Sequence, residues 1–121
     1  MQIFDAIISD RGSKYAVSGG AVCTRDDINR CLALLKRRKK FAKATHHSWA
    51  AILMTDAVQL PLKADDGEAG TVNISLRMLT RAELTGHLVI VTRWYGGTHL
   101  GGDRVRHVQD AVSHYPDHAL R

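Results

Sequence analysis

The chain lacks the short motifs that mark several common enzyme and nucleotide-binding classes. It contains no Gly-x-Ser-x-Gly or His-Glu-x-x-His segment, so the usual serine-hydrolase and zinc-protease signatures are absent. Neither Gly-x-x-x-x-Gly-Lys nor Gly-x-Gly-x-x-Gly occurs, which leaves little support for nucleotide binding. We therefore expect a protein that is not an enzyme and that requires no cofactor.

Cysteines and long apolar runs are also scarce. Cys23 and Cys31 lie eight positions apart and form no Cys-x-x-Cys pair, so we interpret both as packing residues. No segment has the character of a secretory signal or the length of an apolar membrane span. These absences favour a cytoplasmic protein that has no membrane partner.

The length and the charged-residue counts of the chain predict one basic domain. A chain of 121 residues can bury a core without disulfide or metal support. Its 17 lysines and arginines exceed its 12 aspartates and glutamates, which gives a formal net charge of +5. This charge favours acidic partners without identifying one.

Apolar periodicity predicts the order β-β-α-β-α-β-α. The expected strands cover residues 3–8, 14–23, 47–54 and 88–95, and the expected helices cover about residues 25–40, about 72 to just before Gly86, and 103–115. A loop is expected over residues 55–69, with a short edge strand near 58–60, and Pro116 is expected to start a polar tail. The predicted fold is an α+β two-layer sandwich, in which a mixed four-stranded sheet carries its helices on one face.

The most informative segment runs from residue 88 to residue 106. Residues 88–91 have the pattern of a strand buried on both faces, and Gly96-Gly97 supplies the backbone freedom for a tight turn. Gly101-Gly102 then precede Asp103, whose carboxylate is expected to cap the last helix. The two glycine pairs could also cradle a phosphate, although Asp103 would compete with it. A strand, a glycine loop and a helix start together predict a binding site.

Arg93, Trp94 and Tyr95 leave the strand just before this loop. Their residue types are typical of protein-binding hot spots. Stacking on an unpaired base is an alternative, supported by the basic run at residues 36–40 and by nearby arginines. A third interpretation is that side-chain alternation buries Trp94 and leaves Arg93 and Tyr95 outside.

An acidic cluster gives a second candidate region. Asp65, Asp66 and Glu68 are close enough in sequence to repel one another. Either a divalent cation compensates them, or they form an acidic turn before the second helix, whose N-terminus favours anions. The spacing does not match an EF-hand.

Two adjacent histidines lie at the start of the third strand. Since successive strand residues point to opposite faces, only one of His46 and His47 can join a given site, and both could be packing residues. If His46 approaches Asp66 or Glu68, the pairing would raise its pKa.

Three motifs in this order resemble the IMPACT family: Lys-Ala-Thr-His-His-Ser-Trp-Ala at 43–50, Asp-Asp-Gly-Glu at 65–68 and Thr-Arg-Trp-Tyr-Gly-Gly-x-x-Leu-Gly at 92–101. The chain resembles the eukaryotic branch more than the bacterial YigZ branch, on the evidence of Arg93-Trp94-Tyr95-Gly96-Gly97 with Gly101, Asp103-Arg104 and His107. The resemblance covers about residues 13–112. It implies the fold of the second domain of a small-subunit ribosomal protein and of domain IV of elongation factor G. We expect residues 1–121 to be one IMPACT-type domain, without the RWD domain of eukaryotic members or the C-terminal domain of bacterial ones.

The resemblance also implies a function. Eukaryotic members are regarded as non-enzymatic regulators of translation that restrain the amino-acid-starvation response kinase by competing for its ribosome-associated activator, and some bind actin. The implied contact residues are His46, Asp65, Asp66, Glu68, Arg93, Trp94, Tyr95, Gly96, Gly97, Gly101, Asp103 and Arg104. Two alternatives stay open: a module that binds RNA or the ribosome, and a metal-dependent phosphohydrolase that uses the three acidic residues.

Overall fold

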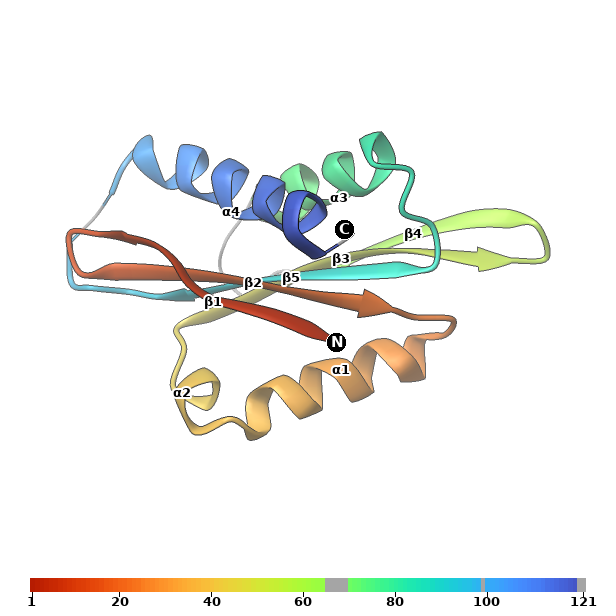
Figure 1. Ribbon diagram of the computed structural model, residues 1–121, viewed down its shortest axis with the longest axis horizontal. Helices are drawn as coiled ribbons and strands as arrows, with labels where there is room; N and C mark the ends of the chain where they lie inside the picture. The colour runs from red at the N-terminus through yellow and green to blue at the C-terminus, as the bar shows by residue number, and fades with distance from the viewer. Residues whose placement is uncertain (65–69, 99, 120–121) are drawn as a thin grey trace.

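The computed structural model describes residues 1–64, 70–98 and 100–119, in which one sheet separates two layers of helices (Figure 1). In chain order the elements are β1 (Gln2–Asp10), β2 (Ser13–Ala21), α1 (Arg25–Arg37), α2 (Lys39–Ala42), β3 (His46–Thr55), β4 (Val58–Ala64), α3 (Thr71–Arg81), β5 (His87–Trp94) and α4 (Asp103–Ala119). None of the helices in these ranges is both long and apolar enough to cross a membrane. The α+β class is confirmed.

The sheet differs from the expected one in its number of strands and in their direction. Its five described strands follow the order β1-β2-β5-β3-β4, and every neighbouring pair is antiparallel. The prediction of a mixed four-stranded sheet was therefore wrong. The additional strand, β4, covers much of the segment expected to be a loop, and it extends well beyond the short edge strand near residues 58–60.

Pro61 does not prevent β4 from pairing. The two-residue turn is closed by the pair Thr55↔Val58, and Ile52↔Pro61 follows three pairs further along. Pairs that exchange hydrogen bonds alternate with pairs that do not, which places Ile52↔Pro61 in the second class. The proline nitrogen then faces away from β3, so no hydrogen bond within the sheet is lost at this edge strand.

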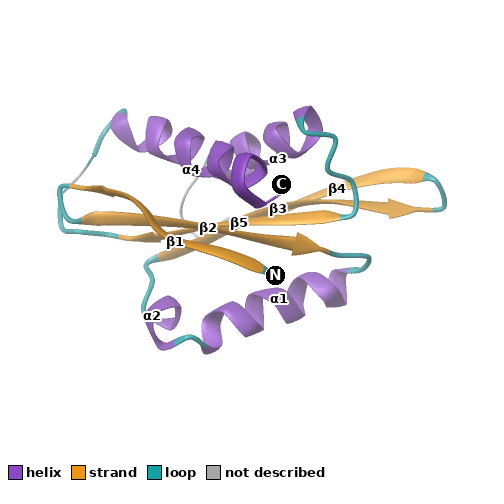
Figure 2. Ribbon diagram, viewed as in Figure 1, coloured by secondary structure: helices purple, strands orange, loops and turns teal. Residues whose placement is uncertain are grey.

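Helices cover both faces of the sheet, which corrects the prediction of a two-layer sandwich (Figure 2). On the α1 side, Leu88 and Ile90 pack in one cluster with Ile28. On the other side, Val89 packs with Leu79 of α3, in a cluster that also contains Tyr115 of α4. Since side chains alternate along β5, a strand that is apolar at every position requires cover on both sides.

Two helix boundaries also differ from expectation. Thr24 and Asp27 form a capping box at the start of α1, as the sequence predicted. The helix nevertheless ends at Arg37, because Arg38 is extended with ψ 124°, and the short α2 then brings Phe41 into the core. At the other end of the chain, Pro116 lies inside α4 rather than at the start of a polar tail.

Candidate functional site

The segment between β5 and α4 carries the two glycine pairs, and we call it the glycine loop. A polar pocket lies where β3, β5, the glycine loop and the start of α4 meet, and we refer to it as the loop pocket. Its volume is about 340 Å³. It is lined by Thr45, His46, Arg93, Tyr95, Leu100, Gly101 and Arg104. Five of these were predicted from sequence, so folding brings much of the predicted set together.

Arg93 lies at the centre of the arrangement. It pairs with His46 of β3 on one side and with Tyr15 of β2 on the other. Its side chain is only 5% exposed, and its Cζ atom lies 5.7 Å from the centre of the Tyr15 ring and 5.5 Å from that of Tyr95. The interpretation that leaves Arg93 outside was therefore wrong, because the two rings cover its guanidinium.

Thr45 fixes the strand end that carries Tyr95. Its N–H donates to the Arg93 carbonyl at 2.9 Å, and its hydroxyl oxygen accepts from the Tyr95 N–H at 2.8 Å. Tyr95 itself is 41% exposed and lies at the pocket edge. Sequence reasoning did not single out Thr45 or Leu100, although each stands within one of the three quoted motifs.

The two adjacent histidines point to opposite faces, as predicted. His46 lines the loop pocket. His47 is buried, with Nε2 2.9 Å from the Phe41 carbonyl oxygen and Nδ1 3.0 Å from the Thr92 hydroxyl oxygen. In a neutral ring, Nε2–H donates to the carbonyl and Nδ1 accepts from the hydroxyl, so both nitrogens are used in packing.

Trp94 does not join the pocket. Its ring lies on the α1 side of the sheet, edge-on to Phe41 with ring centres 5.0 Å apart. The Lys40 ammonium lies 5.2 Å from the ring centre, and the indole N–H donates to the Lys40 carbonyl at 3.0 Å. Trp94 and Tyr95 therefore face different sides of the molecule.

The glycines hold the loop close to the β1–β2 turn. The Gly96 N–H donates to the Ser13 hydroxyl at 3.0 Å, and a Cβ on Gly96 would lie 2.2 Å from the carbonyl carbon of Gly12. Gly97 has φ +86°, the left-handed conformation that glycine adopts without strain. The tight turn predicted for this pair is confirmed. Gly101 has φ +56° and lines the pocket directly.

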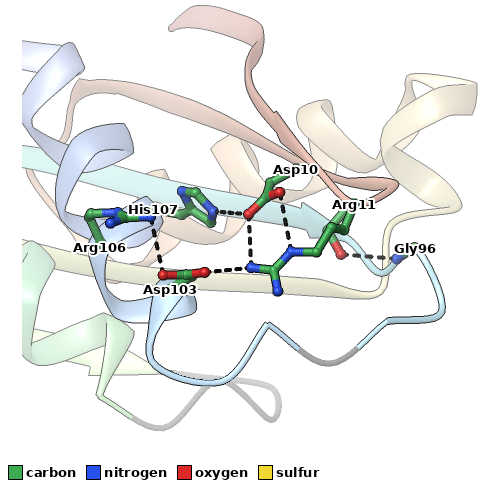
Figure 3. A network of polar contacts seen from close by, with 7 residues as sticks. Asp10, Arg11, Gly96, Asp103, Arg106 and His107 are labelled. Carbon is green, nitrogen blue, oxygen red and sulfur yellow. Dashed lines mark hydrogen bonds and ion pairs between the residues drawn. The ribbon is translucent and has the colours of Figure 1, made fainter.

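Asp103 belongs to an ionic cluster beside the pocket, which we call the turn network (Figure 3). Arg11, in the β1–β2 turn, donates to Asp103 at 2.6 Å and to Asp10 at 3.1 and 3.2 Å. Arg106 donates to Asp103 at 3.1 Å, and His107 Nε2 lies 2.7 Å from a carboxylate oxygen of Asp10. Asp103 is the first residue of α4, and its carboxylate is paired with arginines rather than serving as the expected cap.

The turn network changes the acidity of one member. Hydrogen bonds from Arg11 and then from His107 lower the pKa of Asp10 from 3.8 to about 2. Asp10 therefore stays ionised, and it ties the β1–β2 turn to α4 at any ordinary pH.

The acidic motif at residues 65–68 lies outside the described residues. The pairing of His46 with Asp66 or Glu68 stays a prediction, as does a cation held by Asp65, Asp66 and Glu68. In the part of the chain that the structure describes, no group of three or more histidine, cysteine, aspartate or glutamate residues could hold a metal ion.

The lining of the loop pocket is suited to recognition. Arg104 brings an exposed cation to it, whereas the Arg93 guanidinium is buried beneath the Tyr15 and Tyr95 rings and holds Tyr95 in place. The exposed Arg104 and Tyr95 are residue types that commonly contribute to protein interfaces.

Comparison with known proteins gives a family match over most of the chain. The family model for the Impact N-terminal domain matches residues 11–115. A protein IMPACT homolog of Caenorhabditis elegans is 34% identical over 108 residues, which cover 86% of this chain and 42% of that protein. The chain thus spans less than half the length of this relative.

Two solved structures are similar to the fold. A crystal structure of a hypothetical protein has a TM-score of 0.82 at 22% identity, covering 96% of this chain and 57% of the other. The two-domain translational regulator Yih1 has a TM-score of 0.60 at 31% identity, covering 93% of this chain and 44% of its own. The first supports the fold alone, and the second supports the same family as the sequence match.

Proposed function

Because the chain belongs to the family of the Impact N-terminal domain, we propose that it regulates translation in the cytoplasm by binding proteins and catalyses no reaction. The specific role that we propose is restraint of the amino-acid-starvation response kinase, by competition for that kinase's ribosome-associated activator. The similarity to the translational regulator Yih1 supports the general role. The observation that carries the proposal is the loop pocket, where Arg93, Tyr95 and Arg104 converge from β5, the glycine loop and α4.

The geometry favours a protein partner over RNA. Arginine and tyrosine are enriched among the residues that dominate protein interfaces, and Tyr95 is exposed beside the buried Arg93. A stacking platform for unpaired bases would need several accessible aromatic rings on one face. Trp94 cannot supply the second ring, because it packs against Phe41 on the other side of the sheet.

The proposal is tested by competition. Purified chain is added to a binding assay between the activator and the kinase, and the displaced kinase is measured. Tyr95→Ala and Arg104→Ala should each weaken displacement by about tenfold or more, the loss expected of a hot spot. Arg37→Ala, which removes an exposed cation from α1 on the other side of the sheet, should leave displacement unchanged.

Two results would count against the proposal. Absence of displacement at saturating chain would exclude competition for the activator. Full displacement by both pocket variants would show that the contact lies on another surface.

Two further measurements test the other partners. Co-sedimentation of the same variants with filamentous actin tests whether actin is a second protein partner. Retention on ribosomes that disappears with added salt would favour the RNA-binding alternative.

A further inference from the structure

A second concave surface lies between α3 and α4, and we call it the helix groove. Its volume is about 660 Å³. Its apolar lining comes from α3 and the residue after it and from α4, and Arg77 and Arg81 stand along α3. The apolar residues are Ile74, Met78, Ala82, Val112 and Pro116. Both arginines are exposed, whereas Ile74 and Met78 are half-buried and Val112 is buried. The groove therefore has an apolar floor beside a cationic edge.

The surface continues toward the loop pocket. A neighbouring hollow of about 240 Å³ is lined by Arg77 and Arg104, with Ile74, Val105 and Val108 as its main apolar contributors. Val105 is 50% exposed, so apolar surface reaches the start of α4. Arg104 is shared with the loop pocket, whereas Arg77 and Arg81 are not. The helix groove is thus a separate surface that can be changed without touching the loop pocket.

The charge of the groove is not balanced within the described residues. Arg77 and Arg81 are one helical turn apart, and no ion pair joins either of them to another described side chain. Arg11 and Arg106 show the contrast, since each pairs with Asp103. Asp117 is the single acidic residue among the described side chains that line the groove. A complementary ligand must therefore carry negative charge together with apolar surface.

We propose that the helix groove docks an acidic amphipathic helix of a partner protein. Apolar side chains at helical spacing would occupy the floor over the half-buried Ile74, Met78 and Pro116, and carboxylates along one edge would meet Arg77 and Arg81. The 11 residues of α3 span about 16 Å, which matches roughly three turns of a partner helix. No aromatic side chain is among the described residues that line the groove, so the surface lacks the stacking platforms of single-stranded nucleic acid sites.

The test uses three probes on the full chain labelled with ¹⁵N. The first is a Leu/Glu amphipathic peptide of roughly 16 residues, long enough to form a helix. The second replaces each of its glutamates by lysine, and the third is a short oligouridine. The acidic peptide should bind most tightly and shift amide signals of α3 and α4, and Arg77→Glu with Arg81→Glu should weaken it by at least about tenfold.

A matched variant separates the groove from net charge. Arg30→Glu with Arg37→Glu makes the same charge change on α1, across the sheet, and it should leave the affinity within about twofold of the original. Equal weakening by both double variants, equal binding of the acidic and basic peptides, or no binding of the acidic peptide would overturn the proposal. Tighter binding of oligouridine at the same amides would replace it by a nucleic acid surface. None of these results bears on competition for the activator, which is measured separately with the loop-pocket variants.

Discussion

At the scale of the residue, Gly96 shows how much of the site the sequence could predict. A pair of glycines after a strand indicates a tight turn, and Gly97 with its positive φ confirms it. The requirement at Gly96 is different, because its Cα lies against the backbone of Gly12 and Ser13 from the β1–β2 turn. Contact between two segments so far apart in sequence has no local pattern, so it could not be predicted.

Gly96→Ala should lower the free energy of unfolding by about 1–3 kcal/mol, the usual cost of forcing an extra group into a packed position. The new Cβ would lie within 2.6 Å of three backbone atoms, which have little freedom to move. Gly102→Ala is the matched control, since its Cβ would meet no atom within 4 Å and its φ is not positive. Denaturant unfolding of the two variants measures the difference, and equal stabilities would show that the two loops are not held together as described.

At the scale of the element, local signals predicted helix starts better than sheet edges. The Thr24–Asp27 capping box is a pattern of adjacent residues, and it correctly placed the start of α1. β4 does alternate, with apolar residues at positions 58, 60, 62 and 64, but it is mostly exposed and Pro61 interrupts it, which favoured only a short edge strand. The pattern at residues 88–91 did indicate burial on both faces, and this observation conflicts with the prediction that helices cover only one.

The β3–β4 turn offers a test at the same scale. Asp56 and Ala57 have φ values of +50° and +62°, so an alanine occupies a position that two-residue hairpins prefer to fill with glycine. Ala57→Gly should stabilise the chain by about 0.5–1 kcal/mol, because relief of the left-handed strain exceeds the entropy cost of glycine. Ala33→Gly, the same substitution on the exposed face of α1, should instead destabilise it by about 1 kcal/mol. Thermal unfolding gives both signs, and a loss of stability for Ala57→Gly would contradict the turn geometry.

At the scale of the whole molecule, the site depends on segments from both ends of the chain. The loop pocket combines β3, β5 and α4, while the turn network joins the end of β1 to α4 across 97 positions of sequence. The residue types of the pocket were visible in the motifs, so most of its described lining could be predicted. Arg106, three positions along α4, is a local partner of Asp103, but the pairing of Asp103 with Arg11 could not be predicted, because nothing near residue 103 in the sequence indicates that Arg11 lies beside it.

The turn network makes the stability of the fold depend on acid. Because the pKa of Asp10 is lowered from 3.8 to about 2 in the folded chain, its contribution is fully present above pH 4 and is lost as the pH falls toward 2. Asp10→Asn removes this titration, so the unfolding free energy of the variant should fall less steeply over that interval. It should also be lower at neutral pH, because Arg11 and His107 lose their charged partner.

Denaturant unfolding at several pH values between 2 and 5 measures both slopes. Asp26→Asn removes an exposed carboxylate from the first turn of α1, far from the network, and it should keep the slope of the original chain. If Asp10→Asn and the original chain lose stability in parallel, Asp10 does not carry the acid dependence. The ionic part of the link between the β1–β2 turn and α4 would then be the Arg11–Asp103 pair, in which both side chains are more than 40% exposed, and such pairs contribute little to stability. The apolar packing of Tyr15 against Val108 and Val112 would hold α4 on the sheet.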